Sequence, residues 1–231
     1  MFPCPASTAG VIAGLTLLSA GRIDRETREV EGWTVRVDKA LLAGPDAGLG
    51  RKALRALGHK LAEIAEVVPA DRLAALRRVV IVVDARHPLA SMQYHPSAGW
   101  LRDHGYEPGL AKCVHVPRAT DLAGRFVIDQ QPMAVLHELA HAYHDQVLGF
   151  DDPRVRAAWE RFRDSGRYEA VLHASGGRRK HYALTNPMEF FAEMTEAYFG
   201  TNDFFPFVRA ELRQELPDVH RLISEVWGVS R

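Results

Sequence analysis

The sequence predicts an α+β protein that folds as one domain, with a small mixed sheet in the N-terminal half and a helical C-terminal half. Strand-like patterns lie before residue 117, and helix-like patterns dominate after residue 130. Strands that come first and helices that follow are typical of this class. A chain of 231 residues is long enough to bury a full hydrophobic core.

Three segments have the patterns of strands. Trp33–Val37 alternates apolar and polar residues, as a half-buried strand does, whereas Val79–Val83 is a continuous apolar run typical of a buried central strand. Lys112–Val116 alternates again, and Pro117 directly after it indicates a strand near the sheet edge. Such a strand can pair with an extended peptide. Tyr94–Trp100 is interpreted as a packed surface loop, with a lid or specificity loop as the alternative.

Apolar residues at helical spacing predict a helix from Gly50 to Val68, ended by Pro69, and a short second helix capped by Asp71 that runs to Arg77. Caps and prolines delimit the later helices. These are predicted over Gln131–Leu148, Asp152–Arg163, Asn186–Phe199 and Pro206–Trp227.

Lys and Arg balance Asp and Glu at 29 each, so no overall charge points to a nucleic acid or an anionic membrane as a partner. Residues 1–21 contain an apolar run, Val11–Leu18, followed by small residues, but no Lys or Arg precedes it. They are either a signal segment or a disordered N-terminus before a domain at 22–231. A secreted or extracytoplasmic location is slightly favoured over the cytoplasm. No other stretch approaches the roughly 20 apolar residues that span a bilayer.

The motif His137-Glu138-Leu139-Ala140-His141 is the main indication of chemistry. Histidines four apart on a helix share a face and can bind one zinc ion. An apolar stripe supports the helix independently of the motif, and it consists of Leu136, Leu139, Ala140, Tyr143 and Val147. Glu138 lies beside both ligands and can take a proton from a water that zinc activates.

A third ligand is needed. The metzincin extension fails, because His144 stands where its glycine belongs and Val147 where its third histidine belongs. We expect His144 to be a polar helix-surface residue or a substrate contact. A carboxylate from a later helix remains, and Glu189 and Glu193 share a face there. Glu189 also stands at the capping-box position after Asn186, so spacing alone leaves three options open: Glu189 as ligand, Glu189 as cap, or Glu193 as ligand.

The segments HELAHAYH and YALTNPMEFFAE resemble the catalytic domain of anthrax lethal factor and related Pro-Pro endopeptidases, which are glutamate zincins. The resemblance covers Gln131 to Phe207 and implies a zincin-like domain in which the sheet packs on the HExxH helix. It implies Glu189 as the third ligand of one zinc ion, and Tyr182 as the donor that stabilises the oxyanion. It also implies Glu193 as a carboxylate that accepts a hydrogen bond from a zinc-binding histidine.

The expected function is therefore that of a zinc metallopeptidase acting on a peptide or protein. Two alternatives stay open: a zinc hydrolase of a non-peptide amide, and a catalytically silent binding module on the same fold. The presence of Glu138, which has no role in holding metal, speaks against the silent module.

Overall fold

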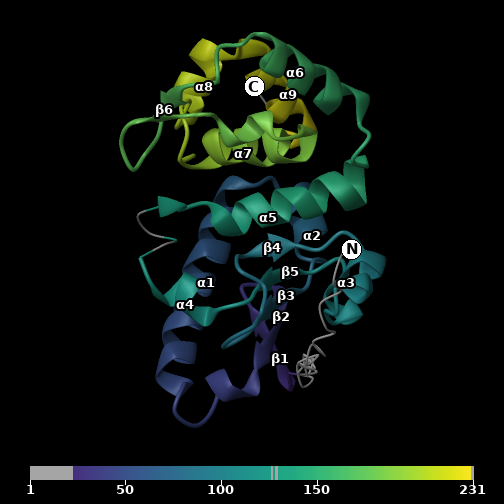
Figure 1. Ribbon diagram of the computed structural model, residues 1–231, viewed down its shortest axis with the longest axis vertical. Helices are drawn as coiled ribbons and strands as arrows, with labels where there is room; N and C mark the ends of the chain where they lie inside the picture. The colour runs from purple at the N-terminus through teal and green to yellow at the C-terminus, as the bar shows by residue number, and fades with distance from the viewer. Residues whose placement is uncertain (1–22, 126, 128–129, 230–231) are drawn as a thin grey trace, which may run out of the picture.

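The computed structural model describes residues 23–125, 127 and 130–229, so the candidate signal segment lies outside the described residues. Figure 1 shows α5 (Ala134–Tyr143) crossing the middle of the molecule. The sheet and the earlier helices lie on one side of α5, and the later helices lie on the other. The protein is a mixed α+β structure, as predicted.

The main sheet has five strands in the order β1-β2-β3-β5-β4. The central pairings β2–β3 and β3–β5 are parallel, and the outer pairings β1–β2 and β5–β4 are antiparallel. The small mixed sheet is therefore confirmed. Its strands are β1 (Arg25–Val30), β2 (Trp33–Asp38), β3 (Ile81–Val83), β4 (Gln93–Tyr94) and β5 (Val114–Val116).

The strand around Val114 lies near the sheet edge, as predicted, but it is not itself an edge strand that could pair with a peptide. β5 is paired on both sides, through Val114 with Ile81 of β3 and with Tyr94 of β4. The edge strand is β4, which is only two residues long and lies in a segment rich in glycine and proline. Pro117 follows β5 without belonging to it, so its missing N–H disrupts no strand pairing.

Four helices accompany this sheet: α1 (Ala47–Val67), α2 (Ala70–Leu76), α3 (Ala98–Asp103) and α4 (Ala119–Ala123). α1 buries residues at helical spacing, as predicted, and Gly50 lets its first turn approach the backbone of Leu41. Asp71 does not cap α2; the N-cap is Pro69, and Asp71 lies in the first turn.

The second half contains α5 followed by a π-helical turn (His144–Leu148), then α6 (Pro153–Asp164) and the hairpin of β6 (Val171–Leu172) and β7 (Arg178–Arg179). A 3-10 turn (Tyr182–Leu184) leads into α7 (Pro187–Phe199). The predicted helix from Pro206 to Trp227 is in fact two helices, α8 (Arg209–Glu215) and α9 (Pro217–Val226). The break falls at Pro217, which has no N–H to continue α8.

The π-helical turn changes which residues after α5 face the core. One extra residue enters the turn, so Val147, expected in the apolar stripe, is 46 % exposed, and Leu148 packs against the core instead. His144, expected at the helix surface, is fully buried. Its ring packs against Phe150 and Phe191. The expectation for Val147 assumed a continuous α-helix. His144 keeps helical backbone angles one turn after the buried Ala140, so its burial already follows from a regular helix.

One hydrophobic cluster joins the two sides of α5, with side chains from the sheet, α1, α5, α6, α7 and α9. Leu136, Leu139 and Ala140 of α5 are fully buried in it, whereas His137, Glu138 and His141 are only partly buried. The helix therefore has one face in the core and another free to line a cleft. Among the described helices, none is long and apolar enough to cross a membrane.

Candidate metal centre

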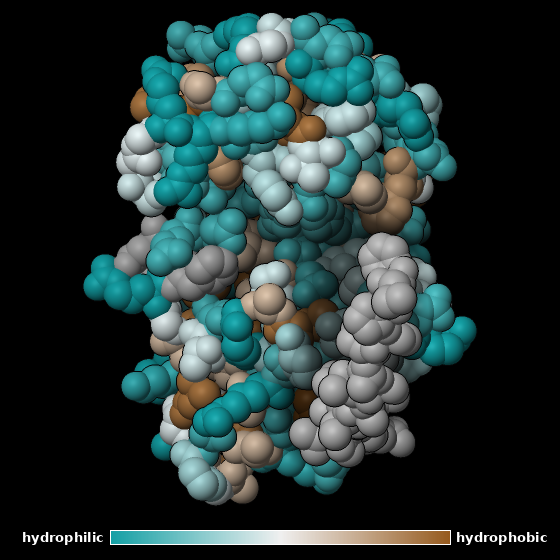
Figure 2. All heavy atoms as spheres, viewed as in Figure 1, coloured by the Kyte–Doolittle hydropathy of each residue, from teal (hydrophilic) through white to brown (hydrophobic). Residues whose placement is uncertain are grey.

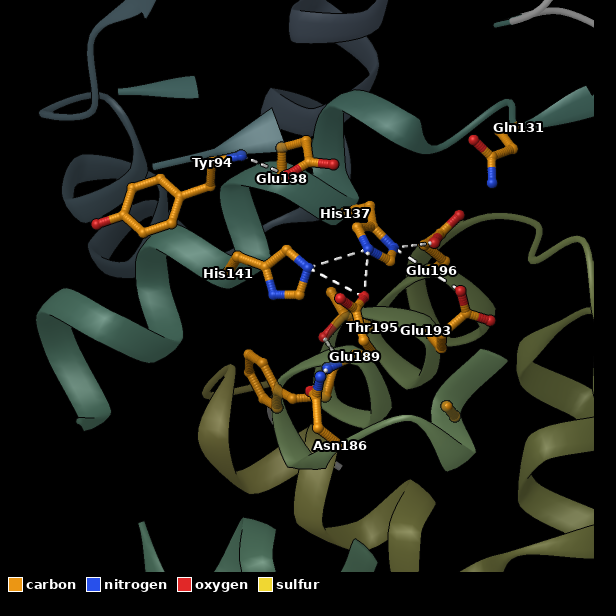
Figure 3. Close-up of polar contacts among 12 residues, drawn as sticks. Tyr94, Gln131, His137, Glu138, His141, Asn186, Glu189, Glu193, Thr195 and Glu196 are labelled. Carbon is orange, nitrogen blue, oxygen red and sulfur yellow. Dashed lines mark hydrogen bonds and ion pairs between the residues drawn. The ribbon is translucent and has the colours of Figure 1, made fainter. Parts of the chain in front are cut away.

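α5 and α7 form the largest helix-to-helix contact around the motif, and they place its side chains together (Figure 3). Asn186 begins α7, and its side-chain oxygen accepts a hydrogen bond from the backbone N–H of Glu189 at 2.8 Å. The carboxylate of Glu189 points instead toward His137 and His141. The N-cap is thus present, and the Glu189 side chain is directed at the histidines.

Three ligand atoms form a nearly equilateral triangle. The distance is 3.1 Å between Nε2 of His137 and Nε2 of His141, 3.1 Å from His137 Nε2 to Glu189 Oε2, and 3.2 Å from His141 Nε2 to the same oxygen. Zinc bonds of 2.0–2.1 Å in a tetrahedron place ligand atoms about 3.3–3.4 Å apart. The triangle is therefore close to the size that zinc requires, and these three residues can hold a metal ion.

The second nitrogen of His137 is held by Glu196. Nδ1 of His137 lies 2.6 Å from Oε1 of Glu196, but 4.0 Å from Oε1 of Glu193. Since a carboxylate only accepts, Nδ1 carries the proton and the lone pair of Nε2 faces the triangle. The structure thus gives to Glu196 the hydrogen bond that the resemblance implies for Glu193.

Glu193 lies behind the triangle in a buried polar region. One of its oxygens is 3.7 Å from Nδ1 of His181 and has no hydrogen-bond partner among the described residues. Burial, followed by the negative charge of Glu196, raises the pKa of Glu193 well above its usual value. Glu193 therefore lies behind the site without a hydrogen bond to His137, and its environment favours the neutral carboxyl group.

The charges of the site favour an ionised Glu189. Burial alone would raise the pKa of this carboxyl group, but hydrogen bonds with His137 and His141 lower it to about 2. Burial alone would lower the pKa of His137, but its hydrogen bonds with Glu189 and Glu196 outweigh this effect and raise the pKa well above its usual value. A cation is thus strongly favoured between these groups, either a proton on His137 or a metal ion in its place.

Glu138 faces away from the triangle toward the edge strand (Figure 3). Its Oε2 accepts a hydrogen bond from the backbone N–H of Tyr94 at 2.6 Å. Burial raises its pKa, which brings the carboxylate closer to the proton affinity that a general base needs near neutral pH.

A cleft of about 470 Å³ opens over these residues. Figure 2 shows the surface hollowed between the two sides of the molecule, with hydrophilic residues along much of the hollow. β4 and its neighbours form one wall, and the rim includes Tyr182, whose side chain is 48 % exposed. All six residues predicted for the site therefore gather in or directly behind this cleft: His137, Glu138, His141, Tyr182, Glu189 and Glu193.

Comparison with protein-family models, with curated proteins and with solved structures finds no match to this chain. The family resemblance stays a prediction, and only the geometry of the site supports a function.

Sequence reasoning missed two residues of the site. Glu196 lies seven residues after Glu189, a spacing that returns to the same helix face, so the signal was present in the sequence. Tyr94 was assigned to a loop, because a two-residue strand leaves no alternating pattern. Only its pairing with Val114 brings its N–H to Glu138.

Proposed function

We propose that the protein is a zinc-dependent metallopeptidase. The observation that carries this proposal is the triangle of His137 Nε2, His141 Nε2 and Glu189 Oε2, with edges of 3.1–3.2 Å, in a cleft that Glu138 also lines. Two histidines and one carboxylate are the usual ligands of a catalytic zinc that keeps one position open for water or substrate. A third ligand from a later helix supports a glutamate zincin of the lethal-factor-like type.

Each residue then has a chemical task. His137, His141 and Glu189 would hold a zinc ion, which would supply Lewis-acid activation of a water molecule and of the scissile carbonyl group. Glu138 would accept a proton from the attacking water and pass it to the leaving amine, and burial, which raises the pKa of Glu138, suits both roles. Glu196 keeps the ring of His137 oriented through its 2.6 Å hydrogen bond.

Tyr182 is the proposed donor to the oxyanion. It precedes α7 by a single 3-10 turn and lines the same cleft as the two histidines and Glu189. Burial, followed by the charge of Glu189, raises the pKa of its phenol, so the hydroxyl stays protonated at neutral pH and can donate. A hydrogen-bond donor that points at the developing oxyanion stabilises the transition state most strongly in a site shielded from water.

A peptide is proposed rather than a small amide, because the edge strand β4 forms one wall of the cleft. The outward N–H of Tyr94 is already bonded to Glu138, so an extended chain would pair with this edge only through the remaining outward main-chain groups. Among the described lining residues there is no lysine or arginine, and the carboxylates are Glu138, Glu189 and Glu196, of whose charge a bound divalent cation would offset two units. A neutral or basic peptide is therefore the expected substrate rather than an acidic one.

The test combines zinc analysis with cleavage of a diverse peptide mixture, using Glu138→Gln as the control. We expect about one zinc per chain in both proteins and cleavage by the intact protein alone. Zinc without cleavage of any peptide would favour the silent binding module, and cleavage of amides but not peptides would favour the non-peptide hydrolase. Loss of zinc is expected in Glu189→Ala, and an unchanged zinc affinity in that variant would contradict the ligand set.

A further inference from the structure

Tyr94 joins the edge strand to the motif helix at two separate points. Its backbone N–H donates to Oε2 of Glu138 at 2.6 Å. Its hydroxyl donates to Oδ2 of Asp145 at 2.6 Å and accepts from Nε2 of Gln146 at 3.0 Å, both in the turn that ends the helix. The residue is 7 % exposed, so these bonds are shielded from solvent. Among the described strand residues, Tyr94 alone donates a hydrogen bond to Glu138.

The direction of the Tyr94 N–H follows from the strand pairing. The N–H and the C=O of His95 both bond to the neighbouring strand segment, at Cys113 and Lys112. In an antiparallel pair successive residues point their main-chain groups to opposite sides. The N–H of Tyr94 therefore points out of the sheet edge, and Glu138 occupies that position. A main-chain donor fixed by a sheet can hold a carboxylate more firmly than a mobile side chain can.

A buried chain of polar side chains supports the same strand from inside the sheet. Nε2 of His95 lies 3.3 Å from Nδ1 of His115, whose Nε2 lies 2.8 Å from Oδ2 of Asp84. Arg25 of β1 binds both oxygens of Asp84, at 2.7 and 2.8 Å. Because a carboxylate only accepts, His115 donates to Asp84 and accepts from His95. The chain thus ties the end of β4 to β5, to the end of β3 and to β1.

A second metal site is the alternative for this cluster, since Asp84, His87 and His115 have suitable spacing. Two contacts argue against it. The guanidinium of Arg25 lies against both Asp84 oxygens, and its positive charge repels a cation. Nδ1 of His87 accepts the N–H of Leu89 at 3.2 Å, so in the neutral ring the proton is on Nε2 and no lone pair is free. The cluster therefore acts as a hydrogen-bonded support.

We propose that Tyr94 is the positioning residue of the general base. Its N–H holds Oε2 of Glu138 in place, which leaves Oε1 to act on the water, and two anchors keep the strand still. One anchor is its own phenol on Asp145 and Gln146, and the other is the chain that begins at His95. This inference rests on the proposed function, because a general base is needed only for hydrolysis.

The kinetic test uses Tyr94→Phe, which removes both phenol bonds and leaves the backbone N–H. Looser placement of Glu138 should lower kcat about tenfold with zinc content and KM unchanged, since small misplacements of a catalytic group are costly. Tyr168→Phe is the matched control, because Tyr168 is equally buried, makes no hydroxyl hydrogen bond in the described structure and does not line the cleft. Its kcat should match that of the intact protein. If Tyr94→Phe cleaves peptides with an unchanged kcat, the positioning role of Tyr94 is refuted while the proposed peptidase function stands.

A second measurement needs no activity. The amide proton of Tyr94 is followed by NMR in the zinc-loaded protein and in Glu138→Gln, because a short bond to a carboxylate shifts an amide resonance strongly downfield. We expect that shift to shrink in Glu138→Gln, and the amide to exchange with solvent faster in Tyr94→Phe. If the chemical shift of the Tyr94 amide proton is the same in Glu138→Gln as in the intact protein, the hydrogen bond between Tyr94 and Glu138 is refuted. If no peptide is cleaved at all, the proposed function fails and this measurement still decides whether the strand holds Glu138.

Discussion

Replacing Glu196 by Gln should weaken zinc binding about tenfold, whereas Glu193→Gln should change it much less. The two residues are a matched pair, since both are nearly fully buried glutamates on the same helix. Only Glu196 lies within hydrogen-bond distance of the His137 ring, at 2.6 Å from Nδ1, against 4.0 Å for Glu193.

The magnitude follows from the bond that changes. A glutamine oxygen can still accept the Nδ1–H of His137, so the substitution removes the charge of the acceptor and keeps the bond. Hydrogen bonds to charged groups contribute about 1.5–3 kcal/mol and neutral ones about 0.5–1.5 kcal/mol. The loss of about 1–1.5 kcal/mol corresponds to roughly tenfold in affinity, at the lower end of the effect known for such outer carboxylates.

The assay is competition between the protein and a chromophoric chelator at fixed pH, with apparent zinc Kd as the measured quantity. Thermal unfolding of the metal-free variants serves as the folding control. An equal or larger loss of affinity in Glu193→Gln would refute the assignment of Glu196, and it would restore the role that the family resemblance implies for Glu193.

Three further substitutions test the fold and the site. His144→Phe should raise the free energy of unfolding by about 1–2 kcal/mol at pH 7, because both ring nitrogens of the buried His144 lack partners among the described residues. Burial lowers the pKa of His144 to about 4, so His144 takes up a proton on unfolding once the pH falls below ~6.5. The free energy of unfolding of the intact protein should therefore fall by about 2 kcal/mol between pH 7 and 5 because of this residue. Urea unfolding of His144→Phe at the two pH values should show a decrease smaller by that amount. Tyr182→Phe should lower kcat about 100-fold with zinc content intact, and an unchanged kcat would remove Tyr182 from the mechanism. Gly50→Ala should cost about 3 kcal/mol or more in unfolding free energy, because its Cβ would meet the carbonyl oxygen of Leu41 at 1.9 Å, whereas Gly58→Ala on the same helix has room and should be neutral or stabilising.

The helices of the second half were largely predictable because their ends carry strong local signals. Asn186 and Pro187 predict the start of α7, and Asp152 with Pro153 predicts the start of α6. The side chain of Asp152 accepts hydrogen bonds from the first two backbone N–H groups of α6. Pro217 is an equally local signal, because a proline ends the preceding helix, and it divides the predicted last helix into α8 and α9. Caps and prolines act through the nearest backbone groups, so no tertiary contact is needed to predict their effect.

Two strands of the main sheet lack an apolar pattern for different reasons. β1 has the sequence RETREV, with four exposed residues in its middle, and it forms because the two-residue turn Glu31–Gly32, with both residues at positive φ, folds it back on β2. β4 is too short for any pattern, and it forms because β5 offers its main chain for pairing. The contact of Tyr94 with Glu138 therefore could not be predicted from local sequence, although both residues belong to the same site.

The buried charge on α7 bears on whether the protein holds a metal ion. Glu189, Glu193 and Glu196 all lie on the face of α7 that meets His137. Burial is the main reason that the pKa values of Glu193 and Glu196 are raised, and repulsion among the carboxylates adds to it. Buried carboxylates without a cation cost several kcal/mol each, and replacing one by an apolar residue is often stabilising. A scaffold with no metal would gain stability by losing these glutamates, whereas a bound divalent cation offsets their charge, so their presence favours a protein that folds around a metal ion.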